Sequence, residues 1–167
     1  MSEPTFSLVV ATDRNRGIGV GGKLPWRLRE DMRHFRELTT GSDNSVIMGR
    51  KTWESIPDKF RPLPGRRNVV MTKNGNYKVP DGVWISASLD GALAVQASNI
   101  FVIGGAEVYA EAIDHPGCKD MYLTRVQGEY ECDTFFPPCE GLFSFGEVLG
   151  AFSENGVDYS IERWVHT

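Results

Sequence analysis

The chain has 167 residues and a mass of 18.6 kDa, the size of one domain whose core can fold without disulfides or metal ions. A composition of 41% hydrophobic and 24% charged residues excludes a disordered or collagen-like chain, and no apolar run reaches the ~20 residues that cross a bilayer. The net charge of −4 is unevenly spread: residues 1–78 hold 15 of the 18 basic and 8 of the 22 acidic side chains, which indicates an anionic partner or a solvated basic face.

Strands are predicted where β-branched and other apolar residues form short runs: 6–11, 45–48, 68–71, 83–85, 100–103, 121–124, 143–145 and 159–164. Helices are predicted where apolar residues recur at helical spacing or a capping residue occurs: 27–39, a short helix from Arg50, Ser88 to about Ala97, and from Gly105 through Ile113. Four glycines within 13–26 predict a mobile loop without regular structure, and the prolines of 56–67 predict a rigid loop.

This order of elements predicts a single α/β domain over 1–167. Alternating strands and helices favour right-handed crossovers and a mostly parallel sheet. The strands after Gly117, with no helix between them, favour an antiparallel C-terminal edge. Because ligands of such sheets bind at the carboxyl ends of the strands, the loops at 13–26, 49–50 and 104–105 are candidate site loops.

Asp31 occupies an unusual position on its predicted helix. At 100° per residue it falls within the apolar stripe of Leu28, Met32, Phe35 and Leu38. A carboxylate that faces a core is costly unless it is paired. Asp31 therefore either stabilises the helix N-terminus or binds nitrogen donors of a ligand in an apolar pocket, where desolvation would raise its pKa.

Three loops carry groups suited to anions. Gly104–Gly105 would let a phosphate approach the N-terminus of a helix, although glycine pairs are also common in tight turns. Residues 49–52 add two cations and a hydroxyl, which suit phosphate oxygens or simply an exposed helix start. Residues 61–66 would present arginines on a stiff loop, for a carboxylate or for solubility.

Several chemistries are not expected. The histidines and cysteines lack the spacing of a metal site, and no hydrolase nucleophile motif or aromatic nucleic-acid motif occurs. An odd number of unpaired cysteines and a start without signal-peptide features favour free thiols in the cytoplasm, with no membrane or nucleic-acid partner. The residues considered for metal binding are His34, His115, His166, Cys118, Cys132 and Cys139.

Taken together, the motifs resemble dihydrofolate reductase from about Phe6 to Trp164. The matching segments are Leu24-Pro25-Trp26 with Asp31 and Phe35, then Val46–Ile56, Arg61–Arg66, Ile103–Gly105 and Asp133–Pro137. The resemblance implies an eight-stranded, mostly parallel α/β sheet with an antiparallel C-terminal edge and about four helices. It also implies NADPH-dependent reduction of 7,8-dihydrofolate to tetrahydrofolate, with hydride transfer to pterin C6 and protonation at N5.

The resemblance assigns a substrate site. It implies that Asp31 binds the pterin, that Thr124 hydrogen-bonds this carboxylate, and that Trp26 holds a water molecule nearby. It implies that Arg66 binds the glutamate α-carboxylate. The implied substrate-binding residues are Val9, Val10, Asp31, Met32, Phe35, Ile56, Leu63, Arg66, Ile103 and Thr124.

The resemblance also assigns a cofactor site for NADPH, beneath a mobile loop at 14–23 that closes over the nicotinamide. Glu107 is unexpected there, because an anion does not favour phosphate binding. The implied cofactor-binding residues are Ala11, Ile18, Gly19, Gly22, Lys23, Gly49, Arg50, Lys51, Thr52, Met71, Thr72, Lys73, Ile103, Gly104, Gly105, Ala106, Glu107, Val108 and Tyr109. The resemblance further implies that antifolate inhibitors bind to the protein and that the protein is a monomer.

Two alternatives compete with this interpretation. One is a reductase of the same fold acting on a pyrimidine of riboflavin synthesis, and the other is a catalytically silent NADP-binding module. Asp31 with Trp26 and Arg66 argues against the first, because that substrate has a ribityl phosphate and no glutamate tail. A carboxylate in an apolar stripe argues against the second, because binding alone does not require it.

Overall fold

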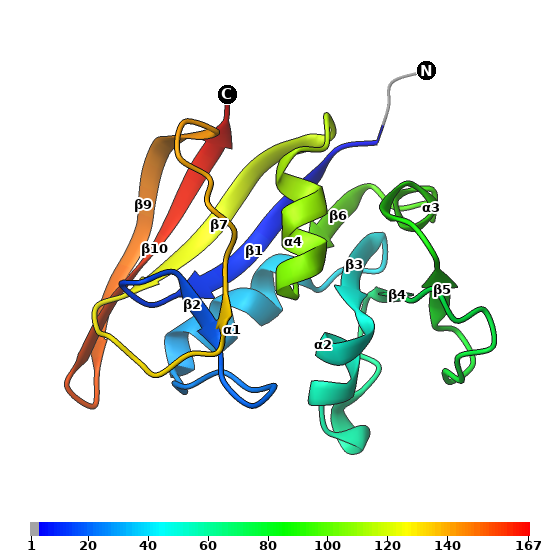
Figure 1. Cartoon of the computed structure of the whole chain (residues 1–167), viewed down its shortest axis with the longest axis horizontal. Coiled ribbons are helices and arrows are strands. Elements are labelled where there is room, and N and C mark those ends of the chain that lie inside the picture. The colour runs from blue at the N-terminus through cyan, green and yellow to red at the C-terminus, as the bar shows by residue number, and fades with distance from the viewer. Residues whose placement is uncertain (1–3) are drawn as a thin grey trace.

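A computed structural model describes residues 4–167, and Figure 1 shows its elements. The strands are β1 (Phe6–Thr12), β2 (Gly17–Gly19), β3 (Asn44–Gly49), β4 (Arg67–Met71), β5 (Trp84–Ser86), β6 (Asn99–Val102), β7 (Cys118–Val126), β8 (Thr134–Phe135), β9 (Phe143–Glu154) and β10 (Val157–His166). The helices are α1 (Arg29–Thr39), α2 (Arg50–Ser55), α3 (Leu89–Leu93) and α4 (Ala106–Ile113), with a 3-10 turn at Asp58–Phe60.

Eight strands form one sheet in the order β5-β4-β3-β6-β1-β7-β10-β9. In this spatial order, each neighbouring pair from β5 through β7 is parallel. Strand β10 pairs antiparallel with both β7 and β9. The predicted fold class, a mostly parallel α/β sheet with an antiparallel C-terminal edge, is confirmed. No helix within residues 4–167 has the length and apolar composition that crossing a membrane requires.

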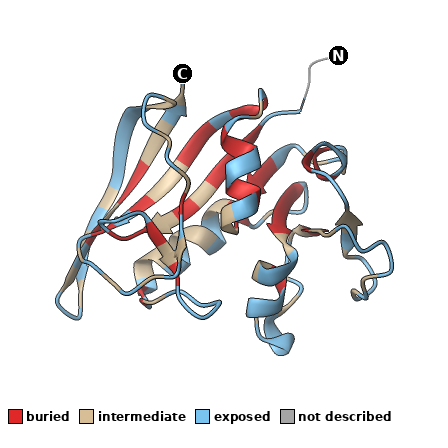
Figure 2. Cartoon of the chain, viewed as in Figure 1, coloured by how far each residue is buried: buried red, intermediate tan, exposed pale blue. Residues whose placement is uncertain are grey.

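The central strands are buried on both faces, as Figure 2 shows, whereas β9 is largely exposed. Because successive strand residues point to opposite faces, β1 directs Phe6, Leu8 and Val10 into the core cluster that contains α3 and α4. Strand β3 directs Val46 and Met48 to the other face, where they pack with Trp53 of α2 and with Leu38 of α1. Helices therefore cover both faces of the sheet, α3 and α4 on one face and α1 and α2 on the other.

Two predicted boundaries are wrong. Ser88 caps α3 as expected, since its Oγ accepts from the Gly91 N–H at 3.0 Å, but the helix ends at Leu93 instead of near Ala97. The chain must leave the helix because the Ser98 N–H bonds the Asp43 carbonyl at 2.9 Å, next to the pairing of β6 with β3. The strand predicted over 143–145 continues to Glu154, because pairing with β10 holds a segment with weak local pattern.

The prediction that residues 13–26 lack regular structure is also wrong. Residues Gly17–Gly19 form β2, which pairs antiparallel with β8 more than 100 positions later. Asp13 anchors the start of this loop: its buried carboxylate accepts from the backbone N–H groups of Asn15 at 2.9 Å, Gly17 at 2.7 Å and Tyr130 at 2.9 Å. The sequence analysis did not predict this role of Asp13. The only local signal for it is the position of Asp13 between a strand and a glycine-rich turn.

Candidate active site

Asp31 lies in the first turn of α1 and is partly buried against β7. The Thr124 hydroxyl donates to Asp31 Oδ1 at 2.6 Å, as the resemblance implied. Burial raises the pKa of Asp31 above its ordinary value of 3.8, because it disfavours the charged form; the Thr124 hydrogen bond and the nearby His34 offset part of this rise. The site thus contains a carboxylate with an increased tendency to be protonated.

Helix α1 is held in place by a residue far along the chain. The Arg29 N–H, at the start of the helix, donates to Glu154 Oε2 at 2.7 Å. Glu154 ends β9, so the antiparallel edge of the sheet supplies an anionic partner to the helix N-terminus, which such groups stabilise. This contact positions the helix turn that carries Asp31, and no local sequence pattern could have revealed it.

The predicted apolar stripe around Asp31 is only partly buried. Leu28 is 3% exposed, whereas Phe35 and Leu38 are intermediate and Met32 is 47% exposed. The helix therefore presents an apolar but accessible surface next to its carboxylate. Such a surface can contact a flat apolar ligand without rearranging the core.

Trp26 supplies a polar donor just before the start of α1. Its ring is 7% exposed and packs edge-to-face on Tyr130, with ring centroids 5.2 Å apart. Its Nε1–H is buried and has no hydrogen-bond partner within residues 4–167. Because buried donors are almost always satisfied, this N–H fits the predicted role of binding a water molecule or ligand.

The residues predicted to line the substrate pocket do not all share one face. Val9, Ile56, Leu63 and Ile103 pack on the cluster between the sheet and helices α1 and α2. Val10 points the other way, into the cluster with α3 and α4, and is 5% exposed. The structure therefore separates the Val10 side chain from the other four, because neighbouring strand residues alternate.

Arg66 is presented from the proline-rich loop beside α1. Its Nε–H donates to the Pro64 carbonyl at 2.8 Å and its Nη1–H donates to Thr39 Oγ1 at 2.7 Å. The guanidinium lies 6.0 Å from the centroid of the Phe35 ring. Partial burial and the neighbouring Arg36 lower its pKa, so an anion bound here would relieve an unfavourable concentration of positive charge.

Two side chains hold the Arg66 loop in shape, and sequence reasoning missed the first. Buried Asn68 accepts from the Leu63 N–H at 2.9 Å and donates to the carbonyls of Leu63 at 2.9 Å and Arg66 at 3.1 Å. Arg61 donates to the Trp53 carbonyl at 2.9 Å and lies over the Trp53 ring. Arg61 therefore supports the loop from inside, whereas Arg66 remains available to a ligand.

At the carboxyl ends of β3 and β6, three glycines lie together where α4 begins. We call Gly49, Gly104 and Gly105 the glycine cradle. The Gly49 N–H donates to the Gly104 carbonyl at 2.8 Å, which joins the ends of β3 and β6. A Cβ added to Gly105 would lie 3.3 Å from Thr52 Oγ1, and one added to Gly49 would lie 3.2 Å from Val108 Cγ2. No side chain within residues 4–167 caps α4. Its first N–H groups can therefore receive an anion.

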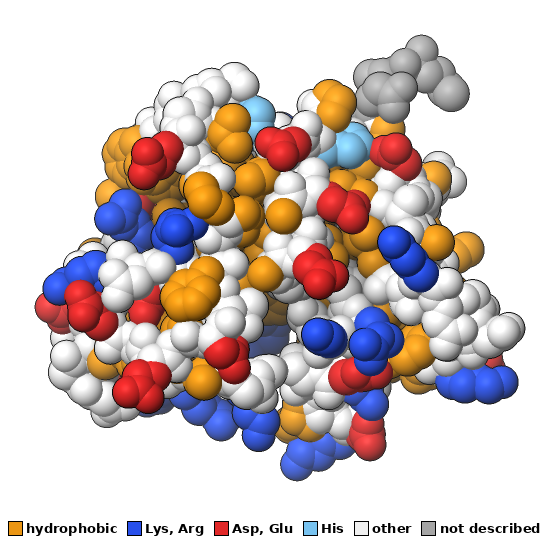
Figure 3. Space-filling model, viewed as in Figure 1, with side chains coloured by type: hydrophobic (Ala, Val, Ile, Leu, Met, Phe, Trp, Pro, Cys, Tyr) orange, Lys and Arg blue, Asp and Glu red, His pale blue; other side chains and the backbone are white. Residues whose placement is uncertain are grey.

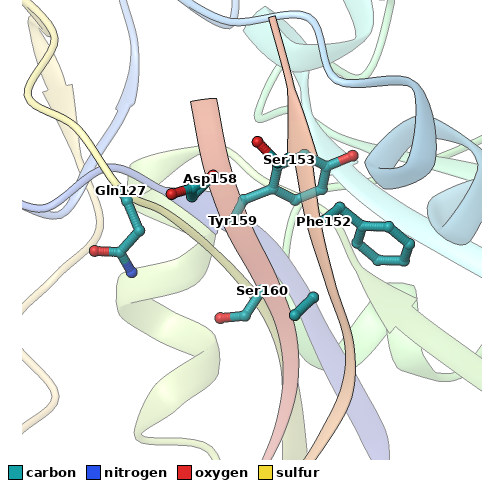
Figure 4. A pocket seen from close by; sticks show the side chains of 7 residues that line it. Gln127, Phe152, Ser153, Asp158, Tyr159 and Ser160 are labelled. Carbon is teal, nitrogen blue, oxygen red and sulfur yellow. The ribbon is translucent and has the colours of Figure 1, made fainter. Parts of the chain in front are cut away.

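The surface is hollowed beside this cradle. Figure 3 shows a recess below the N-terminus of α4, between the β2 loop and α2, with Lys and Arg side chains gathered over α2. Arg50 and Lys51 are exposed there. A different depression, drawn in Figure 4 and lined mainly by β9 and β10, contains none of the predicted site residues: Gln127, Ala151, Phe152, Ser153, Asp158, Tyr159 and Ser160. The recess, and not that depression, is the candidate ligand site.

The residues predicted to bind the cofactor differ in how far they are exposed to solvent. The side chains of Val108 and Tyr109 belong to the core, and the Tyr109 hydroxyl donates to the Val9 carbonyl at 2.6 Å, so only their backbone can face a cofactor. Glu107 is exposed to solvent, which agrees with a carboxylate outside a phosphate cradle. The other exposed members are Gly22, Lys23, Arg50, Lys51 and Lys73, and the partly or fully buried ones are Ala11, Ile18, Gly19, Gly49, Thr52, Met71, Thr72, Ile103, Gly104, Gly105 and Ala106.

The fold and the site define an α/β protein whose candidate ligand site lies at the carboxyl ends of a parallel sheet, between the partly buried Asp31 carboxylate and the N-terminus of α4. The sequence profile described as Dihydrofolate reductase matches residues 5–161. The chain therefore belongs to the dihydrofolate reductase family, as the motifs indicated.

Individual relatives agree with this assignment. A dihydrofolate reductase of Heliothis virescens is 43% identical over 150 residues, covering 82% of this chain and 81% of its own. A bifunctional dihydrofolate reductase-thymidylate synthase of Daucus carota is 47% identical over 177 residues and covers 96% of this chain. This chain spans about a third of the length of such bifunctional relatives. The Schistosoma mansoni dihydrofolate reductase structure has a TM-score of 0.85 at 32% identity, covering 99% of this chain and all of that one.

Proposed function

We propose that the protein catalyses NADPH-dependent reduction of 7,8-dihydrofolate to 5,6,7,8-tetrahydrofolate. The observation that carries the proposal is the partly buried Asp31 carboxylate, which is hydrogen-bonded to Thr124 at 2.6 Å. It lies at the carboxyl ends of the parallel strands, as the glycine cradle does. Membership of the dihydrofolate reductase family and relatives named for this activity support it. The geometry favours neither alternative function.

Asp31 binds the pterin in this proposal. Its carboxylate accepts hydrogen bonds from the 2-amino group and the ring N3, which are the donors that suit an oxygen pair. The raised pKa favours a proton within the site, as protonation at pterin N5 requires. The buried Trp26 N–H holds the water molecule through which that proton reaches N5. Apolar side chains of α1 and β1 exclude other water from the pterin.

The residues at the glycine cradle fit NADPH, which supplies the hydride when bound. The uncapped N-terminus of α4 suits a pyrophosphate, because its N–H groups and dipole favour negative charge. Arg50, Lys51 and Lys73 provide the cations that a 2′-phosphate requires, and Thr72 a hydroxyl. Backbone atoms of Ala11 and Ile18 bind the nicotinamide carboxamide, beneath the loop that contains β2.

The uneven charge of the chain acquires a specific meaning in this proposal. Arg66 binds the α-carboxylate of the substrate's glutamate tail, and the cations at α2 bind the cofactor's phosphates. Both ligands are anions, and both are bound by residues of the basic first half. We also propose that antifolates compete at the pterin site and that the protein acts as a monomer in the cytoplasm. Its three free cysteines are compatible with that reducing compartment.

The direct test is a spectrophotometric assay of NADPH consumption with dihydrofolate, with and without methotrexate. We expect turnover that methotrexate blocks and that Asp31→Asn largely abolishes. NADPH binding without turnover would instead support a silent binding module. Turnover of a ribityl-phosphate pyrimidine, but not of dihydrofolate, would support the riboflavin-pathway reductase.

A further inference from the structure

Arg50 is held by Glu54 and Tyr77, two residues to which the resemblance assigned no role. The Arg50 Nη1–H donates to Glu54 Oε1 at 2.9 Å, one helical turn along α2. The Tyr77 hydroxyl, from the loop after β4, donates to Glu54 Oε2 at 2.7 Å. Both oxygens of Glu54 are therefore engaged, and the three side chains form a relay from Tyr77 through Glu54 to Arg50. The Tyr77 hydrogen bond is the largest cause of the lowered pKa of Glu54.

The position of Tyr77, the first side chain of this relay of hydrogen bonds, is held by its ring and its backbone. Its ring is partly buried and packs on the cluster that contains Trp53 and Val70. Its backbone closes a turn, with the Tyr77 N–H donating to the Asn74 carbonyl at 3.1 Å. The Asn74 N–H in turn donates to Thr72 Oγ1 at 3.2 Å. The phenol hydroxyl therefore has a well-defined position relative to α2.

The relay leaves part of Arg50 free. The Arg50 side chain is 44% exposed, and its single side-chain hydrogen bond within residues 4–167 is donated by Nη1. An arginine restrained at one nitrogen loses less rotamer entropy when its other N–H groups bind a phosphate. Because exposed arginine–glutamate pairs contribute little to stability, the relay is better explained by the position it imposes on Arg50 than by folding energy.

We propose that Tyr77 and Glu54 are positioning residues that orient Arg50 for the 2′-phosphate of NADPH. The inference depends on the proposed function, because it requires the cofactor to lie along α2. It assigns specificity for the phosphorylated cofactor partly to a hydroxyl that does not itself touch the phosphate.

The test measures binding of two nucleotides to the protein by calorimetry, without substrate. Adenosine 2′,5′-bisphosphate carries the 2′-phosphate, and adenosine 5′-monophosphate lacks it. We expect Tyr77→Phe to weaken binding of the bisphosphate by about threefold to tenfold, the effect of one net hydrogen bond, and to leave the monophosphate within about twofold. Glu54→Gln should act in the same direction. In an Arg50→Met background, the effect of Tyr77→Phe should fall within about twofold.

Glu37→Gln is the matched control, because Glu37 pairs with Arg33 on α1 at the same spacing, at 3.0 Å, away from α2. It should leave both affinities unchanged. An unchanged ratio of affinities in Tyr77→Phe, or tighter bisphosphate binding by Glu54→Gln, would overturn the inference, the latter by showing that Glu54 repels the phosphate. If the wild-type protein shows no preference for the bisphosphate, the proposed cofactor assignment fails as well.

Discussion

Thr124 on β7 donates a hydrogen bond of 2.6 Å to the carboxylate of Asp31 on α1, a residue 93 positions earlier in the chain. The bond anchors one oxygen of a carboxylate that burial makes costly to ionise. It connects the strand that begins the antiparallel edge to the helix that carries the site's acid. The site chemistry therefore depends on the packing of α1 against the sheet.

Asp31→Asn should fold and bind NADPH but lose turnover by about a hundredfold or more at neutral pH, the usual scale for a group that supports proton transfer. Asparagine can still accept the Thr124 hydrogen bond but cannot supply a proton or a charge. Single-turnover measurement of hydride transfer tests this expectation. Near-normal rates would remove Asp31 from the catalytic machinery.

The same substitution should stabilise the ligand-free protein at neutral pH. The pKa of Asp31 is raised in the folded state, so its contribution to stability is full below about pH 4, where both states are protonated, and is lost as pH rises through the folded-state pKa. Asparagine avoids this loss. Thermal unfolding should give Asp31→Asn the higher Tm at pH 7, with the difference shrinking toward pH 4. A difference independent of pH would contradict the linkage.

Thr124→Val should raise the pKa of Asp31 further, because it removes a hydrogen bond that favours the charged form. A titration of the Asp31 carboxyl carbon by NMR measures the shift directly. Thr134→Val is the control, since Thr134 donates to Asp133 at 2.8 Å in an exposed pair outside the site. A lowered or unchanged Asp31 pKa in Thr124→Val would show that the hydrogen bond does not govern its ionisation.

Arg66→Leu should weaken dihydrofolate binding by about tenfold to a hundredfold, the effect of losing charge-assisted hydrogen bonds, while a pterin without the glutamate tail should bind as before. Arg67→Leu is a matched control, because Arg67 pairs with Asp43 at 3.3 Å and belongs to β4. Fluorescence titration with both ligands distinguishes the cases. Equal losses for the two ligands would refute the carboxylate site.

Gly17→Ala should destabilise the protein by about 1–3 kcal/mol, the range for overpacking a filled site. A Cβ at Gly17 would lie 2.4 Å from Cys132 Sγ and 2.9 Å from the buried Asp13 carboxylate, so the junction of β2 and β8 would have to open. Gly75→Ala is the control, because no atom lies within 4 Å of its added Cβ. Urea unfolding measures both variants, and equal stabilities would contradict a packed junction.

Much of the fold could be predicted because burial is encoded locally. The apolar runs of β1, β3, β4 and β6 mark strands that are buried on both faces, and helices follow between them. The candidate site was predictable in part for the same reason, since Asp31 stands out as a charge within an apolar helical stripe. Asn68 and Glu154 did not stand out, because their partners lie in loops or helices that local patterns do not connect to them.

Local patterns alone predict the eight strands of the main sheet and the four helices, the glycines that allow close backbone approach, and the residue types that can bind anions. Periodicity and side-chain chemistry are local properties, so they can be read without knowing the fold. The folded chain is needed to show that Gly17–Gly19 pairs with β8, that Val9 and Val10 face opposite clusters, and that Tyr77 reaches Glu54. These relationships join distant segments, and the order and registry of the strands, not the residues alone, bring them together.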